Sequence, residues 1–228
     1  MTIRHKAYML PLDKGLSSDW NDDHEVDFEE ELIMYDTFLF DDLMPWWSIA
    51  QCSGGGGVGC GMSNNHNFVE IASGGGGAGL ASMRIGDSDM TNKLDLPIAT
   101  FTLLTDTIDG IELGFFRSND APFTALQIGA YFRIDTSKIY AVTGDGVNEE
   151  AVDVTPPLFA IAKYYQLRIE FGSSWVKFYI DNLLVEVSTN TQYNPTDDLT
   201  FKASVKDVSG TPNLIHMDGF GLERLRKK

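Results

Sequence analysis

The chain has 228 residues, of which 43 % are hydrophobic and 22 % are charged, and its formal net charge is −16. These fractions are typical of a folded globular chain and exclude a wholly disordered one. No stretch approaches ~18 uninterrupted apolar residues, so we expect no membrane span, and the N-terminus lacks the apolar core of a signal peptide. The negative charge would repel a phosphate backbone, which argues against nucleic acid as a partner.

We interpret residues 1–25, which are polar and irregular, as an N-terminal arm before a single domain over residues 26–228. Within that domain, residues 53–59 and 73–79 both contain Ser-Gly-Gly-Gly-Gly, which predicts two glycine-rich loops. Because glycine allows close backbone approach and positive φ, two interpretations stay open. The loops are either flexible, or closely packed around a symmetry axis or against a partner.

Short segments of alternating polarity follow one another from about residue 96 onward. Residues 125–134 and 165–171 place apolar side chains on one face and polar ones on the other, which is typical of half-buried strands. Asp181-Asn182 supplies turn chemistry between two such segments. The predicted strands are 68–71, 96–104, 125–134, 165–171, 175–180, 183–189, 199–205 and 214–225. With no helical stripe, the predicted fold class is all-β: an antiparallel two-sheet β-sandwich or jelly roll.

Residues 138–205 resemble concanavalin A-like lectin and glucanase sandwiches. In that family a strand of the type hydrophobic-Arg-Ile-Glu-aromatic precedes a hairpin of the type Val-x-Phe-Tyr-Ile-Asp-Gly. This chain reads LRIEF over 167–171 and VKFYIDN over 176–182, with Asn182 at the turn glycine. The resemblance implies a concanavalin A-like jelly roll, a fold that hosts lectins, glycosidases and structural modules. Similar modules without a secretion signal are frequent in virion proteins of tailed bacteriophages.

One acidic pattern, formed by Glu25, Asp27 and Glu29, resembles the Glu-x-Asp-x-Glu signature of retaining β-glucanases. On a strand these side chains would share one face, where two carboxylates could act as nucleophile and acid/base. The glucanase motif, however, lies near mid-chain, whereas this pattern lies close to the start, in an acidic run where chance matches are expected. We therefore interpret it as a solvated acidic surface and predict that the protein is not an enzyme.

Three tryptophans are candidate glycan-binding residues. Trp46, Trp47 and Trp175 could stack on sugars as in a lectin, although aromatic residues in a sandwich more often belong to the core or an interface. Cys52 and Cys60 flank the first glycine tract, and without a secretion signal we expect free thiols rather than a disulfide.

Two clusters of oxygen-bearing side chains are candidate calcium sites. Asp145, Asn148 and Glu149 form one, and Asp87 and Asp89 form the other. Neither matches a complete calcium loop, so we interpret both as solvated turns and predict no metal and no cofactor.

The predicted function is a non-enzymatic structural protein of a bacteriophage virion, made in the host cytoplasm. The preferred role is capsid decoration, in which the protein binds the major capsid protein or another virion protein. A homo-oligomer, a trimer by analogy, would gain avidity from repeated weak contacts. Two alternatives stay open: a lectin-like adhesion module that binds a glycan on a phage tail or cell surface, and a β-glucanase that uses Glu25 with Glu29 or Glu30.

Overall fold

A computed structural model describes most of the chain. The described residues are 31–36, 47–63, 66–75, 79–85, 97–105, 109–189, 199–208, 210 and 212–225. These residues form 15 strands and no helix. A membrane-spanning helix is therefore absent from the described part of the chain.

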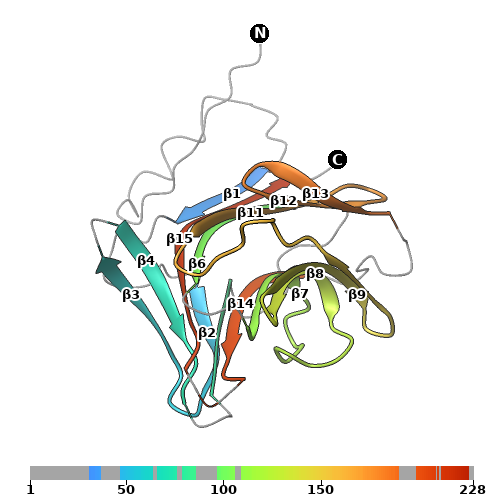
Figure 1. The fold of residues 1–228 in the computed structure, drawn as a ribbon. Helices are drawn as coiled ribbons and strands as arrows, with labels where there is room; N and C mark the ends of the chain where they lie inside the picture. The colour runs from blue at the N-terminus through green and yellow to red at the C-terminus, as the bar shows by residue number, and fades with distance from the viewer. Residues whose placement is uncertain are drawn as a thin grey trace, which may run out of the picture.

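The strands form two antiparallel sheets packed face to face (Figure 1). Sheet A has the order β13-β12-β11-β6-β15-β4-β3, and β1 also pairs with β15. Sheet B has the order β10-β9-β8-β7-β14-β5-β2. The strands of sheet A are β1 (Glu31–Asp36), β3 (Gly57–Ser63), β4 (His66–Ala72), β6 (Ile98–Thr105), β11 (Tyr164–Phe171), β12 (Val176–Ile180), β13 (Leu183–Ser188) and β15 (Leu214–Leu225). The strands of sheet B are β2 (Trp47–Ser53), β5 (Leu80–Ile85), β7 (Ile111–Phe116), β8 (Ile128–Asp135), β9 (Lys138–Asp145), β10 (Glu149–Asp153) and β14 (Thr200–Lys206). The predicted fold class is confirmed.

Side-chain alternation determines which face of each strand meets the other sheet. Along β11, Leu167, Ile169 and Phe171 are buried, while the residues between them are partly exposed. The turn to β13 uses Asp181 and Asn182, both with positive φ (51° and 63°), as a tight hairpin of this twist requires. Between the sheets the core is rich in aromatic rings. These include Phe101, Phe115, Phe132, Phe171, Phe178, Phe201 and Phe220, which pack mainly edge to face.

The two glycine tracts pack against each other inside the chain. Gly54 and Gly55, with φ of +61° and +84°, form the turn between β2 in sheet B and β3 in sheet A. A Cβ on Gly74 would lie 1.6 Å from the carbonyl oxygen of Gly54. β3 begins at Gly57, so the turn after β2 is shorter than the loop predicted over 53–59; of the second tract, the structure describes residues 73–75 and 79, which lie between β4 and β5. The two tracts thus pack closely on each other within the chain, while packing around a symmetry axis or against a partner stays a prediction.

The structure also describes Cys52 and the strand predicted over residues 125–134. Cys52 at the end of β2 is an exposed free thiol, as expected. The strand predicted over 125–134 begins later, at Ile128, because Leu126 has φ +59° and lies exposed in the preceding loop.

Candidate functional site

The outer face of sheet B, which points away from the core, carries a buried polar network built around β7. Alternation on β7 directs Ile111, Leu113 and Phe115 into the core and leaves Glu112 and Phe116 on the outer face. Register places Arg133 of β8 directly opposite Glu112. Charged side chains from neighbouring strands therefore meet on this face.

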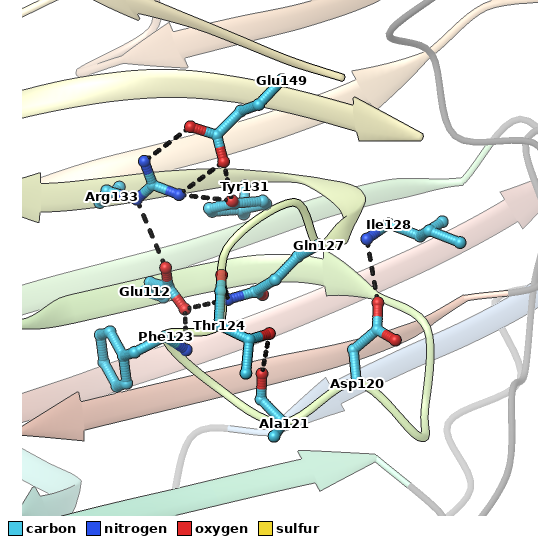
Figure 2. A network of polar contacts seen from close by, with 10 residues as sticks. All are labelled: Glu112, Asp120, Ala121, Phe123, Thr124, Gln127, Ile128, Tyr131, Arg133 and Glu149. Carbon is cyan, nitrogen blue, oxygen red and sulfur yellow. Dashed lines mark hydrogen bonds and ion pairs between the residues drawn. The ribbon is translucent and has the colours of Figure 1, made fainter. Parts of the chain in front are cut away.

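Arg133 lies at the centre of the network (Figure 2). Its Nη1 and Nη2 each donate to a different carboxylate oxygen of Glu149 at 2.8 Å. Nη2 also donates to the Tyr131 hydroxyl at 2.7 Å, and Nε lies 3.4 Å from Oε1 of Glu112. Burial opposes ionisation of Glu149, but the hydrogen bonds and charge of Arg133 outweigh it and lower the pKa of Glu149.

Glu112 is the most buried carboxyl group of the network, with 2 % of its surface exposed. Its Oε2 accepts hydrogen bonds from the backbone N–H of Phe123 at 2.9 Å and from Nε2 of Gln127 at 2.8 Å. Burial raises the pKa of Glu112, and these donors together with Arg133 offset only part of that effect. The side chain thus holds a proton at a higher pH than an exposed glutamate does.

The loop over residues 117–127 lies across this outer face and is held there by buried charge. Nζ of Lys202, on β14, donates to the carbonyl oxygens of Arg117, Ser118 and Asp120 at 2.7, 2.8 and 2.8 Å. Oδ2 of Asp120 accepts from the backbone N–H of Ile128 at 2.9 Å. The loop therefore seals much of the face from water.

Two open pockets lie beside this loop, and the loop contributes to the wall of each. The acidic pocket, of about 330 Å³, is lined by three acids and two cations: Asp109, Glu112, Asp135, Arg133 and Lys206. The basic pocket, of about 270 Å³, is lined by Arg84, Lys202, Asp120 and small polar residues. The loop gives residues 123–125 to the acidic pocket and 118–122 to the basic pocket.

Asp109 and Asp135 form a carboxyl pair in the acidic pocket. Burial raises the pKa of Asp109, and its hydrogen bond and charge interaction with the Asp135 carboxyl raise it further. The acidic pocket thus combines one deeply buried acid, Glu112, with a second acid of raised pKa, Asp109, an arrangement suited to proton transfer.

The structure separates the predicted glycan-binding tryptophans. Trp47 is only 6 % exposed and packs edge to face on Phe201 and Phe220, so the prediction of a sugar-binding role for it is wrong. Trp175 is half-buried, its ring covers Gly172, and Nζ of Lys177 lies 4.0 Å from it. Trp46, like Glu25, Asp27 and Glu29, lies outside the described residues.

The predicted calcium candidates do not converge on a common point. Oδ1 of Asp145 accepts the backbone N–H groups of Val147 and Asn148 at 2.8 and 2.7 Å, so it closes its own turn. Glu149 instead binds Arg133. In the part of the chain that the structure describes, no group of three His, Cys, Asp or Glu side chains is arranged so that it could hold a metal ion. Asp87 and Asp89 lie outside that part.

Sequence reasoning missed Glu112, Arg133 and Lys202 as site residues. One signal was present: Glu112 is a single acid within the apolar run Ile-Glu-Leu-Gly-Phe-Phe. A charged residue inside a buried strand needs a partner, and that requirement marks it as a candidate functional residue.

Comparison with solved structures finds the same sandwich in glucanases. The β-glucanase of Bacillus licheniformis superposes with a TM-score of 0.60 at 12 % identity, over 86 % of this chain and 98 % of that one. A β-1,3-1,4-glucanase (lichenase) derived from a mouse hindgut metagenome gives 0.59 at 10 % identity, over 83 % and 98 %. The catalytic domain of an endo-1,3-β-glucanase (laminarinase) from Thermotoga petrophila gives 0.56 at 12 %, over 88 % and 100 %.

At these identities the likeness shows the fold, a concanavalin A-like jelly roll. The sequence matches no protein-family model and no curated protein.

These comparisons overturn two predictions from sequence. A non-enzymatic structural role in a virion is contradicted, as is the prediction that the protein is not an enzyme, because the structural neighbours are glycan-cleaving enzymes. The resemblance over residues 138–205 describes strand pairing that any sandwich of this class shares, so it carried no information on phage origin. The trimer, the protein partner and the location predicted with that role stay predictions.

Proposed function

We propose that this chain is a glycoside hydrolase that cleaves a polysaccharide in the acidic pocket of sheet B. The observation that carries the proposal is the position of Glu112. It is a buried carboxyl group with a raised pKa, it lies on the outer face of a mid-chain strand, and it borders an open pocket with two further acids. The glucanase names of the structural neighbours support a polysaccharide as the substrate class.

Glycoside hydrolysis needs two carboxyl groups with different protonation states. One donates a proton to the departing sugar oxygen, and the other is ionised and acts as nucleophile or as base toward water. Glu112 suits the acid, because burial favours its protonated form. Asp109 and Asp135 line the same pocket and supply the carboxyl groups for the second role.

This assignment differs from the retaining-glucanase signature. The outer-face positions of β7 are Glu112, Gly114 and Phe116, so the strand carries one acid where Glu-x-Asp-x-Glu has three. In the proposed site the second carboxyl group belongs instead to Asp109, before β7, or to Asp135, at the end of β8. The alternative site is the predicted pattern at Glu25, Asp27 and Glu29.

The test is release of reducing sugar by the full chain from β-1,3-glucan, mixed-linkage glucan and a uronic-acid polysaccharide. We expect cleavage of at least one polymer, a loss of about 10²-fold or more for Glu112→Gln, and normal activity for Glu186→Gln on β13. Activity that survives Glu112→Gln but disappears in Glu29→Gln would move the site to the N-terminal pattern. No cleavage of any polymer by the unmodified chain would refute a hydrolase.

A further inference from the structure

We infer that Phe123 is a positioning residue for the carboxyl group of Glu112. Its backbone directs an N–H group at that carboxyl group, and its ring keeps the backbone in the conformation that this requires. The N–H of Phe123 donates to Oε2 of Glu112 at 2.9 Å, and the φ angle of Phe123 is +59° (Figure 2). The inference rests on the proposed function for its catalytic meaning, and it adds to the three acids a residue that controls one of them.

The local sequence makes this backbone conformation unexpected. Pro122 and Phe123 are the central residues of a turn from Ala121 to Thr124, and the Thr124 hydroxyl donates to the carbonyl oxygen of Ala121 at 2.9 Å. A turn with proline first and a left-handed residue second usually carries glycine or asparagine at the second position. Because a Cβ makes the left-handed region costly, phenylalanine at this position needs compensating contacts.

The ring of Phe123 makes a contact that offsets this cost. It is half-buried in the wall of the acidic pocket, and Nζ of Lys206 lies over it, 4.7 Å from the ring centre. Lys206 is the last residue of β14, and its backbone N–H donates to the carbonyl oxygen of Gly110, just before β7, at 2.8 Å. The ring is therefore held against the two paired strands β14 and β7, the second of which carries Glu112.

The hydrogen bond from Phe123 affects both the orientation and the protonation of Glu112. Burial raises the pKa of Glu112, and an N–H donor opposes that rise because it stabilises the ionised carboxylate more than the neutral acid. Gln127 donates to the same oxygen through a side chain, whereas the direction of the Phe123 N–H is determined by the backbone. Phe123 thus determines where Oε2 points and limits how far burial raises the pKa.

The test measures the protonation of Glu112 by NMR titration of the full chain containing carbon-13-labelled glutamate, and the spectrum of Glu112→Gln identifies the signal. Phe123→Ala retains the cost of the left-handed backbone without the ring contact, so the N–H should leave Oε2. Phe123→Gly carries no such cost, so the N–H should stay. We expect the titration midpoint of Glu112 to rise by about half a pH unit or more in Phe123→Ala and by clearly less in Phe123→Gly.

Leu126 provides a matched control in the same loop. Its φ angle is also +59°, and its side chain is exposed instead of lying in the pocket wall. Leu126→Ala and Leu126→Gly should therefore leave the midpoint of Glu112 unchanged, and Phe123→Tyr, which retains a ring, should do the same. Circular dichroism and unfolding midpoints establish that each variant is folded. A ring that only filled space would give the opposite order, because glycine loosens the loop more than alanine does.

Activity separates this inference from the proposed hydrolase. If the chain cleaves glucan, the alkaline limb of its kcat/KM profile should move to higher pH in Phe123→Ala, together with the NMR midpoint. A displaced midpoint without any hydrolysis by the unmodified chain supports the positioning of Glu112 and refutes the hydrolase. An unchanged midpoint in Phe123→Ala, or a larger displacement in Phe123→Gly, overturns the inference and leaves the hydrolase to its own test.

Discussion

The outer faces of the two sheets differ in how deeply their charged side chains are buried. On sheet B, the loop over 117–127 covers the strands, and Glu112 and Lys202 are almost fully buried beneath it. On sheet A, Arg168 lies over the Tyr179 ring at 3.8 Å, and Lys177 lies over Trp175 at 4.0 Å, with these side chains partly in water. Alternation puts polar residues outward on both sheets. The difference is the loop over 117–127, which buries side chains on the outer face of sheet B that would otherwise lie in water.

The comparison shows where function can concentrate in such a sandwich. Charges in water interact weakly with their neighbours, and their loss costs little. Buried charges must be satisfied by specific partners, and their pKa values move far enough to support chemistry. The four predictions below test this difference.

The largest effect is expected at Lys202. Lys202→Met leaves three carbonyl oxygens of the loop without their donor, so the free energy of unfolding should fall by about 3 kcal/mol. Lys177→Met on sheet A should change it by less than about 0.5 kcal/mol. Urea denaturation of both variants measures the difference, and equal midpoints would break the comparison.

A second pair contrasts the two arginines. Arg133→Met removes the partner of Glu149 and leaves the Glu112 carboxyl buried with fewer donors, which should cost about 2 kcal/mol of stability. Arg168→Met loses a cation–π contact at a partly exposed ring, worth ~0.5 kcal/mol. Denaturant midpoints again provide the measurement. A larger loss of stability for Arg168→Met than for Arg133→Met would show that the loop over 117–127 does not shield the charges of sheet B from water.

The raised pKa of Glu112 predicts a pH dependence with a definite sign. Above its ordinary value of 4.5 the folded protein retains a proton on Glu112 that the unfolded chain releases. This contribution to stability is therefore fully present below pH 4.5 and is lost as the pH rises through the folded pKa. Thermal midpoints measured from pH 4 to 8 should fall more steeply for the unmodified chain than for Glu112→Gln, while Glu186→Gln should follow the unmodified chain. Parallel curves for all three would contradict the buried acid.

The smallest effect is expected at the exposed pair of Lys138 and Asp153, whose Nζ and Oδ2 atoms are 2.6 Å apart. Hydrogen bonds from Lys138 and Thr155 lower the pKa of Asp153 from 3.8 to about 2. Its contribution is present above pH 3.8 and is lost as the pH falls through about 2. Because the pair is exposed, Asp153→Asn should lower the urea midpoint at pH 7 only slightly, and the difference from the unmodified chain should disappear as the pH falls through about 2. A clear shift at pH 7 would mean that surface pairs matter more than the comparison allows.

Strands with one wet face were predictable from sequence. The segment predicted over 214–225 matches β15 residue for residue, and β11, β12 and the Asp181-Asn182 turn also appear where alternation placed them. In each case polar residues reach water between buried ones, so a period of two is visible. The fold class followed from these strands.

The site was not predictable in the same way, because β7, the strand that carries Glu112, lacks that period. All six residues of β7 are buried, since the core covers one face and the loop covers the other. Tyr131 was expected on the polar face of its strand, yet it is fully buried there against Phe116. The contacts that bury these groups join residues far apart in the chain, such as Lys202 and Ser118, and no local pattern records them.

The interlocked glycine tracts have an evolutionary consequence for this protein. With Gly74 pressed onto the Gly54 carbonyl, any side chain added at that point displaces the backbone of the opposite tract. Lineages that lengthen or decorate one tract must therefore alter the other at the same time. In related sequences, residues 53–59 and 73–79 should therefore change together, although they are distant in the chain.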